Sequence, residues 1–480
     1  MQPGLLIGER VEAGSGGPIR SVNPADGSGN YEIAGASGAD VDRAAKLAQA
    51  ASRDSAWRQM KPHERARILG RIADAIAVGA EALARQQMLE NGKILGECRA
   101  QAASAAATFR YYAAVCESLE GEAPPPRGNY FGMTLHEPYG VVAAITPWNS
   151  PLTMEAQKIA PALAAGNAVL LKPSEVTPGC GLIVARLALE AGLPPGLLSV
   201  LPGAGAEAGA ALVGHEAVRM ISFTGGTGTG RAIAGVAAGR LVPAALELGG
   251  KSPNIVFADA DLDAAAAGVI GGIFEATGQS CVAGSRLFVE RGAYAGFVER
   301  IAAAARALKP GLPDAPGAQI GPLSTFAQRE RVERFVAQAR AEGGRVLAGG
   351  ARPEDPALER GAYYLPTVID GLTGGAAVCR EEIFGPVLAV LPFDSEDDLV
   401  AQANDTVYGL ACGIWTGDYR RAWRVARAID AGTGWINTYK QLSIASPFGG
   451  FKQSGMGREK GLSGLRLYQQ SKSLYWGLDG

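Results

Sequence analysis

The sequence predicts an α/β protein built around a doubly wound parallel sheet. With 480 residues the chain exceeds one ordinary core, which indicates two or three domains. Its 47% hydrophobic and 19% charged residues, with 66 glycines, are typical of a compact α/β protein. From residue 141 onward, short apolar runs alternate with helical segments, as in sheets whose parallel strands are joined by helices.

The first part of the chain is expected to be helical. Between about residues 38 and 118, Ala, Leu and Ile recur at a spacing of three to four residues. Asp40 is a candidate helix cap, and Asn91-Gly92 is a candidate helix stop. The segment 121–128, with three consecutive prolines, ends this pattern.

The parallel sheet is predicted from four apolar runs separated by three helical segments. The expected strands are 141–145, 168–171, 198–201 and 220–223, and the expected helices are 155–164, 181–191 and about 206–213. Such a sheet binds a nucleotide at the carboxyl edge of its strands.

A second alternating run, from 254 to about 436, predicts another α/β domain with Ala-rich helices at 262–276 and 293–307. The tail 467–480 is too short for a domain and indicates an edge strand or an interface arm.

Charge and polarity argue against several classes of partner. The net charge is −2 and no basic block stands out, so neither nucleic acid nor an anionic membrane is an expected partner. The N-terminus lacks the pattern of a signal peptide, and no run of about 20 apolar residues occurs. We therefore expect a cytoplasmic protein.

Cysteine and histidine usage predicts no metal site. The three histidines are too few and dispersed for metal binding, and none neighbours a plausible nucleophile, which argues against a Ser/His or Cys/His hydrolase. No C-x-x-C pair occurs among the six cysteines, and five of them are expected to be buried small hydrophobes: Cys98, Cys116, Cys180, Cys379 and Cys412.

Two glycine-rich segments are candidates for dinucleotide binding. Residues 203–208 match a relaxed fingerprint, but such matches arise often by chance in an Ala/Gly-rich chain. Residues 223–230 are the stronger candidate, because they follow a predicted strand and open a helix. There the backbone can approach a pyrophosphate, and the helix N-terminus stabilises its charge.

Lys172-Pro-Ser-Glu175 ends a predicted strand two strands before that loop. A carboxylate accepts hydrogen bonds from a ribose diol but repels a 2′-phosphate, so Glu175 favours NAD, with NADP still possible. The alternative is a solvated Lys–Glu pair on a loop.

Cys281 and Glu247 are the candidate catalytic pair. Cys281 lies in Gly-Gln-Ser-Cys-Val-Ala-Gly-Ser-Arg, 34 positions after Glu247 in Leu-Glu-Leu-Gly-Gly-Lys. Covalent aldehyde oxidation needs a thiolate that adds to the carbonyl carbon and a separate base that activates water against the thioester.

Both peptides resemble those of the NAD(P)-dependent aldehyde dehydrogenase superfamily. Matching peptides run from Val-Asn-Pro-Ala at residue 22 to residue 461 and include Ser-Pro-Phe448-Gly-Gly-Phe-Lys. The resemblance implies a doubly wound NAD-binding domain (1–120 and 139–248), an α/β catalytic domain (249–465) and a small β oligomerisation arm (121–138 and 466–480). It also implies a homodimer or homotetramer.

The resemblance also implies roles for individual residues. Cys281 is the expected nucleophile, Glu247 the base for water, and Asn149 an oxyanion donor beside the Cys281 backbone N–H. Gly226 stands where the family usually has serine, so a phosphate contact is expected to be missing. The expected cofactor-binding residues are Ile145, Thr146, Trp148, Lys172, Glu175, Gly225, Gly226, Gly230, Leu248, Gln328, Glu382 and Phe384. The expected substrate tunnel includes Met154, Ser280, Leu442 and Phe448.

The expected reaction is oxidation of a small-molecule aldehyde to a carboxylic acid by NAD, through a Cys281 thiohemiacetal and a thioester hydrolysed by Glu247-activated water. A CoA-acylating variant is an alternative, which retention of Glu247 argues against. A second alternative is a non-catalytic relative that serves as a structural or binding protein. The sequence argues against it, because the four expected site residues are present together: Asn149, Glu247, Cys281 and Glu382.

The substrate is left open between two expectations. Small neighbours of Cys281 favour medium-chain or aromatic aldehydes, whereas Lys440 is the one specific support for an acidic, succinate-type semialdehyde. Charges of both signs are expected at the mouth: Lys440 against Glu275 and Glu155. Polar residues stand where the family often has aromatic ones, and they either widen the entrance or point into solvent: Ser150, Gln157, Glu275, Lys440 and Gln441.

Overall fold

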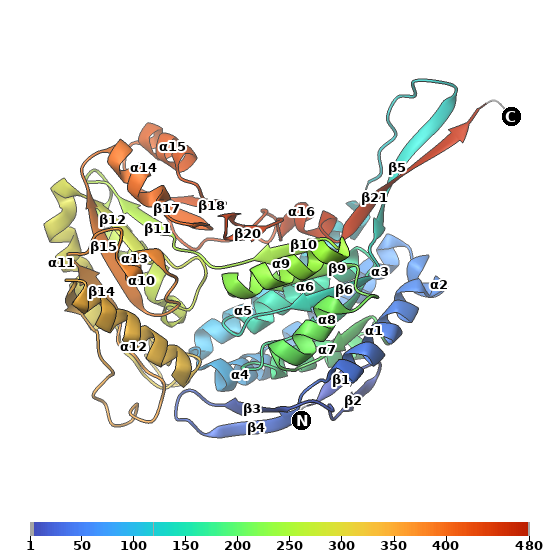
Figure 1. The fold of residues 1–480 in the computed structure, drawn as a ribbon, viewed down its shortest axis with the longest axis horizontal. Coiled ribbons are helices and arrows are strands. Elements are labelled where there is room, and N and C mark those ends of the chain that lie inside the picture. The colour runs from blue at the N-terminus through green and yellow to red at the C-terminus, as the bar shows by residue number, and fades with distance from the viewer. Residues whose placement is uncertain (1–3, 119, 479–480) are drawn as a thin grey trace.

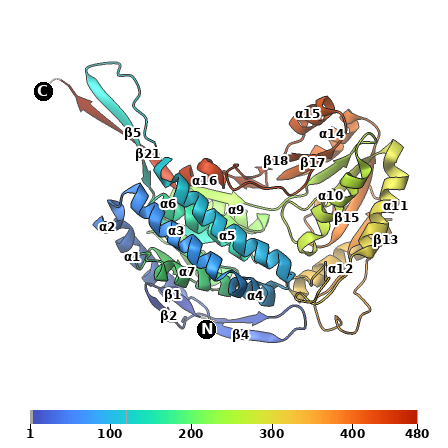
Figure 2. The same ribbon diagram turned by 180° about the vertical axis from the view of Figure 1, so that it is seen from behind.

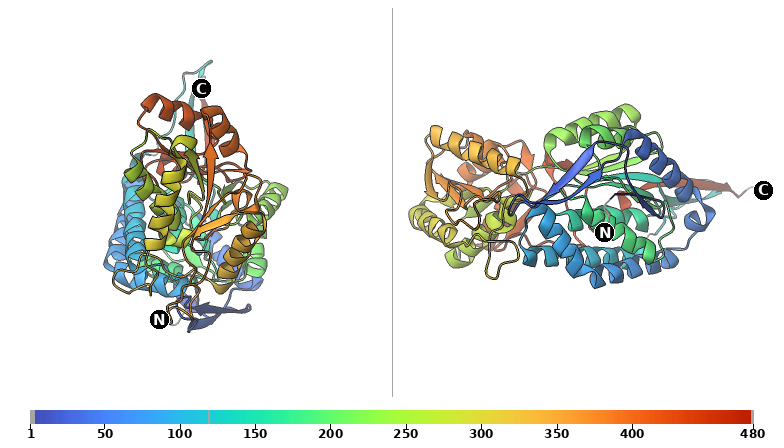
Figure 3. Two further views of the ribbon diagram at one scale, coloured as in Figure 1. Left: turned by 90° about the vertical axis from the view of Figure 1, so that its left-hand side faces the viewer. Right: turned by 90° about the horizontal axis from the view of Figure 1, so that it is seen from below.

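The computed structural model describes residues 4–118 and 120–478. Residues 1–3, 119, 479 and 480, which fall in the predicted first domain and arm, lie outside the described residues. Two α/β lobes stand side by side, and a two-stranded arm projects from the larger one (Figure 1). Seen from below, the two lobes lie next to each other along the long axis of the molecule (Figure 3).

The first sheet confirms the prediction of a doubly wound parallel sheet. Its strand order in the described chain is β2-β1-β8-β7-β6-β9-β10-β20, with β6 to β10 parallel. The parallel strands are β6 (Val141–Ile145), β7 (Ala168–Lys172), β8 (Leu198–Val200), β9 (Met220–Thr224) and β10 (Ala244–Glu247). The antiparallel edge strands are β1 (Leu5–Ile7), β2 (Arg10–Glu12) and β20 (Gly455–Met456).

The connecting helices lie close to their predicted positions. They are α6 (Pro151–Ala164), α7 (Gly179–Glu190), α8 (Ala210–Gly214) and α9 (Thr227–Arg240). Residues 205–209, predicted as part of a helix, form a single π-helical turn before α8. The strands between these helices are buried on both faces, as doubly covered parallel strands must be.

Residues 38–118 are helical, as predicted, and pack on this sheet (Figure 2). Asp40 is not the helix cap: Ser37 is, and Asp40 completes a capping box from the first turn. Gly92 stops α4 as predicted, in a left-handed conformation with φ 71°. The helices are α1 (Gly38–Arg53), α2 (Ser55–Arg58), α3 (Pro62–Val78), α4 (Ala80–Asn91) and α5 (Leu95–Val115), followed by a short 3₁₀ turn (Cys116–Ser118).

The second sheet forms the core of the smaller lobe, where a second α/β unit was predicted. Its order in the described chain is β13-β14-β15-β12-β11-β17-β18, parallel except for β13. The strands are β11 (Pro253–Val256), β12 (Arg286–Glu290), β13 (Arg345–Ala348), β14 (Thr367–Asp370), β15 (Val387–Phe393), β17 (Ala411–Trp415) and β18 (Thr433–Ile436).

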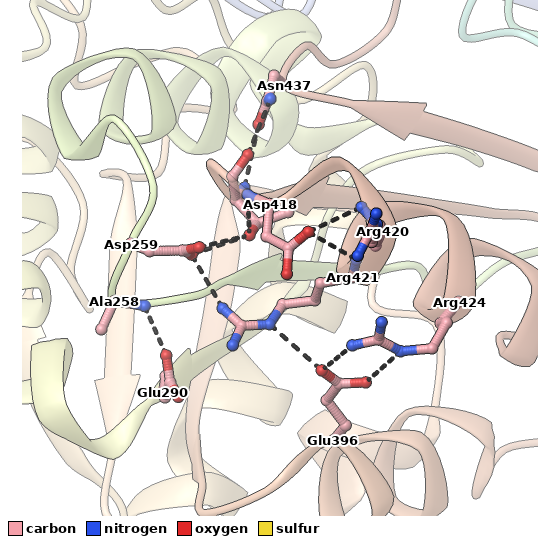
Figure 4. A network of polar contacts seen from close by, with 10 residues as sticks. Ala258, Asp259, Glu290, Glu396, Asp418, Arg420, Arg421, Arg424 and Asn437 are labelled. Carbon is pink, nitrogen blue, oxygen red and sulfur yellow. Dashed lines mark hydrogen bonds and ion pairs between the residues drawn. The ribbon is translucent and has the colours of Figure 1, made fainter.

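Helices cover both sides of that sheet. The predicted helix 262–276 ends two residues early, at α10 (Leu262–Phe274), because Ala276 and Thr277 have positive φ. The helices are α10, α11 (Arg291–Ala307), α12 (Phe326–Ala341), α13 (Ala377–Arg380), α14 (Glu396–Asn404) and α15 (Tyr419–Ala428). A polar network fastens α14 and α15 to the sheet, with the Arg421 guanidinium between Asp259 and Glu396 (Figure 4).

The chain returns to the first lobe after β18. Two short strands, β16 (Tyr408–Gly409) and β19 (Phe451–Lys452), first form an antiparallel pair. Strand β20 then pairs with β10 of the first sheet. Helix α16 (Gly461–Arg466) then packs on α6, and Tyr468 is buried in the first core. Residues 455–468 therefore complete the first lobe, although most of them were predicted within the catalytic domain.

The arm is an antiparallel pair, β5 (Tyr130–Pro138) with β21 (Gln469–Gly477). It extends away from both lobes (Figures 1 and 2). Aromatic side chains stay exposed on it, including Phe131, Tyr475 and Trp476. A second hairpin, β3 (Pro18–Val22) with β4 (Gly29–Ala34), borders the first sheet. None of the helices in the described part of the chain is long and apolar enough to cross a membrane.

Candidate active site

Cys281 lies on the loop between α10 and β12 and faces a cavity of about 440 Å³ between the two lobes. Glu247, Asn149 and the glycine loop after β9 line the same cavity. Burial, and then the nearby carboxylates of Glu382 and Glu247, raise the pKa of the Cys281 thiol to about 12. The thiol is therefore protonated at neutral pH in the protein alone, and it needs a nearby base or positive charge to react.

Glu247 is the last residue of β10 and is only 4% exposed. Neither carboxylate oxygen has a hydrogen-bond partner among the described residues. Burial, and then the charge of Glu459, raise the pKa of Glu247 well above its usual range. An isolated buried carboxylate is a stronger base than a solvated one, which suits it to take a proton from water.

A buried polar cluster lies behind Glu247. The Lys158 ammonium on α6 donates to Glu459 at 2.5 Å and to Ser222 Oγ at 3.0 Å. Gln157 donates to the other oxygen of Glu459, and Tyr468 OH contacts Ser222 Oγ at 3.0 Å. Both oxygens of the Glu459 carboxylate thus accept hydrogen bonds, whereas neither oxygen of the nearby Glu247 carboxylate does so among the described residues.

Asn149 follows β6, and its side chain is buried against the cysteine loop. The Nδ2 group donates to the backbone oxygen of Gln279 at 2.9 Å. One amide hydrogen is therefore used to fix the side chain, and the second remains for an oxygen in the cavity. Asn91 in turn donates to the Trp148 backbone oxygen at 3.1 Å, which anchors this loop to α4.

The glycine loop is shaped for a group that approaches the backbone closely. Gly226 caps α9 and, like Gly228, has open space where a Cβ would stand. A Cβ on Gly230 would lie 2.4 Å from Leu248 Cδ2, so the helix needs glycine there to pack on the strand. A bare helix N-terminus of this kind fits a pyrophosphate.

Lys172 and Glu175 lie at the end of β7. Glu175 accepts from the Gly205 N–H at 2.7 Å and lies 3.4 Å from the Lys172 ammonium. The π-helical turn at 205–209 supplies that N–H, so the weaker glycine segment of the sequence positions the carboxylate. Glu175 lines a neighbouring cavity of about 430 Å³ rather than the one containing Cys281.

Glu382 and Phe384 form the wall opposite the glycine loop. Glu382 accepts from the Gly250 N–H at 3.0 Å, and burial raises its pKa to about 7. Phe384 has a φ of 61° and packs edge-on against Trp148 at 5.3 Å. Gln328 holds this turn by donating to the backbone oxygens of Ile383 and Phe384.

The structure brings most of the predicted site residues to one cavity. Ile145 is the last residue of β6 and Thr146 follows it, and neither lines the cavity. Lys172 and Glu175 lie at its side, as described above. The predicted residues that line the cavity are Asn149, Trp148, Met154, Gly225, Gly226, Glu247, Leu248, Cys281, Gln328, Glu382 and Phe384.

A second cavity, of about 700 Å³, meets the cysteine loop. Ser150 and Ser280 line it, and they directly follow Asn149 and precede Cys281. Lys440 and Glu275 also line this cavity; the Lys440 side chain is 16% exposed, whereas that of Glu275 is 62% exposed. Leu442, 45% exposed, and Phe448, buried against Lys460, line neither cavity.

Two expectations about the mouth are wrong. Glu155 is fully buried on the far side of α6 and does not reach the cavity. Gln157 points into the core toward Glu459 instead of into a tunnel. Both lie on a helix buried on nearly all sides, where a polar side chain gives no sign of which face it occupies.

Sequence reasoning missed several residues of this region. Lys158 carries a signal, because a charged residue inside an apolar helix is buried only when it is paired. Tyr408 and Arg331, which line the Cys281 cavity, and Lys93, which lines the other, carry no such signal in the sequence. No group of three or more potential metal ligands occurs among the described residues.

Comparisons with known proteins agree over nearly the whole chain. The aldehyde dehydrogenase family profile matches residues 11–474. DhaS of Bacillus subtilis (strain 168) is 40% identical over 475 residues, 99% of this chain and 95% of that protein. The crystal structure of PnpE from Pseudomonas sp. WBC-3 is 42% identical, with a TM-score of 0.97 over 100% of this chain and 98% of that one. The NAD⁺ complex of aldehyde dehydrogenase from Bacillus cereus is 39% identical, with a TM-score of 0.97 over 100% and 97%.

Proposed function

Because the chain belongs to the aldehyde dehydrogenase family, we propose that it oxidises an aldehyde to its carboxylate with NAD, using Cys281 as nucleophile and Glu247 as base. The observation that carries this proposal is the shared cavity. A cysteine, an unpartnered buried carboxylate, an amide donor and a bare helix N-terminus all face it. The overall reaction consumes aldehyde, NAD⁺ and water and yields carboxylate, NADH and two protons.

NAD fits the site by the chemistry of its walls. The open backbone of the glycine loop would hold the pyrophosphate, Glu175 with Lys172 the adenosine ribose, and Glu382 the nicotinamide ribose. When bound, NAD supplies the acceptor for the hydride that leaves the aldehyde carbon. PnpE and the Bacillus cereus enzyme both have structures with NAD, which supports the same cofactor here.

The residues of the chain carry the covalent steps. The Cys281 sulfur bonds to the carbonyl carbon, its proton leaves through Glu247, and the free Asn149 N–H stabilises the oxyanion. After the carbon has lost hydride, a thioester to Cys281 remains. Glu247 then takes a proton from water, the water oxygen bonds to the acyl carbon, and the carbon–sulfur bond breaks.

Cys281→Ala and Glu247→Gln test this assignment by NADH formation. Cys281→Ala should retain less than about 1% of the turnover, because the covalent route is lost. Glu247→Gln should show a burst of NADH followed by slow turnover, because the loss of the base slows hydrolysis of the thioester more than it slows acylation. Cys412→Ala, a buried cysteine in β17, is the matched control and should keep its turnover.

Three outcomes would contradict the proposal. Substantial turnover by Cys281→Ala would place the nucleophile elsewhere, and an unchanged steady state in Glu247→Gln would remove the base. A wild-type rate that depends on added CoA would make CoA, rather than water, the acyl acceptor.

The chain is also proposed to assemble as a homodimer or a pair of dimers through its arm. The exposed aromatic residues and the free edges of β5 and β21 support this proposal.

A further inference from the structure

The cavity of about 700 Å³ beside the cysteine loop contains two lysines that the reaction does not use. Its size lies within the usual range of about 300–1,000 Å³ for small-molecule sites. Ser150 and Ser280 line it, and they are the chain neighbours of Asn149 and Cys281, so this cavity adjoins the reacting groups. Lys93 and Lys440 lie in its wall.

Lys93 is a buried cation without a counter-ion. It is 8% exposed, and its ammonium has no hydrogen bond and no carboxylate within 4.0 Å in the described part of the chain. The ammonium is not fully enclosed by other atoms, and Lys93 lines the cavity, so the ammonium keeps contact with the cavity. Lys93 N–H donates to Asn91 Oδ1, and Asn91 in turn holds the Trp148 carbonyl, which ties this lysine to the Asn149 loop.

Lys440 faces the same space from the other lobe. Its side chain is 16% exposed, and its ammonium donates to the Gly271 oxygen at 3.0 Å. Its backbone has a φ of 57°, a conformation that costs energy for a lysine and needs support from the surrounding fold. Two cations from two different lobes thus converge on one cavity.

The carboxylates of the cavity do not neutralise these cations. Glu275 is 3.7 Å from Lys440 and 62% exposed, so the pair is screened at the rim. Glu97 accepts from the Ala276 N–H at 2.9 Å. Burial is the largest influence on both lysines and lowers both pKa values, although Glu97 and Glu275 oppose it. The Lys93 ammonium has no carboxylate within 4.0 Å among the described residues, so it is free to pair with an anion in the cavity.

We propose that Lys93 and Lys440 form an anion subsite for a carboxylate at the far end of the aldehyde, so the substrate is an acidic semialdehyde or a formyl-aryl acid. This rests on the proposed aldehyde oxidation. Apolar side chains in the wall of the same cavity suit a hydrocarbon chain or ring: Ile94, Ile270, Phe274, Leu308 and Ile320. A carboxylate between two ammonium groups makes charge-assisted hydrogen bonds that a neutral aldehyde cannot make.

The first test compares three para-substituted benzaldehydes that differ in charge, by NADH formation. The probes are 4-carboxybenzaldehyde, methyl 4-formylbenzoate and 4-(trimethylammonio)benzaldehyde. We expect kcat/KM for the carboxylate to exceed that for the ester about tenfold, which corresponds to roughly 1.4 kcal/mol. Preference for the ester overturns the proposal. Preference for the cation also overturns it and points to Glu97 and Glu275 instead.

The second test removes each charge while keeping the length of the side chain. Lys93→Met and Lys440→Met should each lower the carboxylate-to-ester ratio of kcat/KM about tenfold, mainly through KM. Lys93→Arg should keep most of that ratio, which separates charge from packing. Lys46→Met, an exposed lysine on α1, is the matched control. A ratio that neither Met variant changes overturns the proposal.

Binding without turnover separates this inference from the proposed reaction. Calorimetry on Cys281→Ala should give a Kd for 4-carboxybenzaldehyde about tenfold weaker once Lys93→Met is added. If the wild type oxidises no aldehyde but this difference appears, the reaction is wrong and the subsite stands. If aldehydes are oxidised but binding ignores both lysines, the subsite is wrong and the reaction stands.

Discussion

Glu247 is buried at the end of β10, and neither of its carboxylate oxygens has a partner among the described residues. Glu175 is the opposite case, because its carboxylate is held by the Gly205 N–H and Lys172 and is 41% exposed. We expect isolation to make the first carboxylate a base, and fixed contacts to make the second a recognition group. The two carboxylates differ in their surroundings and not in their chemistry.

The raised pKa of Glu247 predicts how hydrolysis of the thioester depends on pH. The base must be ionised, so the rate should fall as the pH decreases through a pKa well above 4.5. Stopped-flow measurement of the phase after the NADH burst, between pH 5 and pH 9, isolates this step. In Glu247→Gln the rate of thioester hydrolysis should no longer depend on pH over this range. A wild-type rate that is flat down to pH 5 would contradict a raised pKa.

Glu175 predicts a preference for NAD over NADP. The Gly205 N–H holds its carboxylate in place, and on the proposed site this charge would repel a 2′-phosphate, so kcat/KM should be higher with NAD. Glu175→Gln keeps the size but removes the charge, and it should lower the NAD-to-NADP ratio about tenfold. Glu190→Gln, at the exposed end of α7, serves as the control. Equal use of both cofactors by the wild type would refute the role of Glu175.

Sequence patterns located these residues but not their contacts. The position of Glu175 after a strand could be predicted from the sequence. Its partner Gly205 lies 30 residues away, in the 203–208 segment whose match to a dinucleotide fingerprint could have arisen by chance. Lys158 and Glu459 are 301 residues apart, and nothing local links them. Long-range side-chain pairing depends on how the helices and strands pack together. The spacing of apolar residues along the sequence contains no information on that packing.

Helix α6 places neighbouring residues in three different environments. Met154 faces the Cys281 cavity, Glu155 points into the core beside α7, and Lys158 holds Glu459. Because the helix is buried nearly all round, its polar residues cannot be assigned to faces from amphipathicity. The element itself was predictable, but the orientation of its side chains was not.

Glu155 makes this helix a source of pH-dependent stability. Its carboxylate has no partner among the described residues, and burial raises its pKa well above 4.5. Between pH 4.5 and that raised pKa the unfolded chain loses a proton that the folded chain keeps. The free energy of unfolding therefore falls as the pH rises, by at most about 1.4 kcal/mol per pH unit.

Glu155→Gln should remove that slope and stabilise the protein at neutral pH by roughly 1–2 kcal/mol. Thermal unfolding of the wild type and the variant between pH 5 and pH 8 measures this difference. Glu299→Gln, an exposed carboxylate on α11, is the control. Equal melting curves at every pH would show that Glu155 is solvated or paired in solution.

At the scale of the whole molecule, the arm is the part whose strand edges and aromatic side chains a monomer leaves exposed to solvent. Strands β5 and β21 pair only with each other among the described strands, and the second edge of β5 is bridged only at Thr134, by Glu122. Most of both outer edges is therefore open. Phe131 is 46% and Trp476 47% exposed on this arm. The sequence indicated an arm from its proline-rich start and its position at the chain end, but not the nine-rung pairing between segments over 300 residues apart.

We therefore expect light scattering to give a dimer or tetramer at micromolar concentration. Phe131→Asp combined with Trp476→Asp should reduce the mass, because it places charge on the apolar surface to be covered. Val78→Asp, at a 90% exposed site on α3, should leave the mass unchanged. A wild-type monomer would sink the proposed assembly.

The return of the chain to the first lobe also governs when this protein can fold on the ribosome. Strand β20, the Glu459 that neutralises Lys158, and the buried Tyr468 all emerge after the entire smaller lobe has been synthesised. Until then the larger lobe carries an open sheet edge and an unpaired buried lysine. We therefore expect its folding to be completed only when translation is almost finished, and nascent chains to depend on chaperones for longer than a domain order read along the sequence suggests.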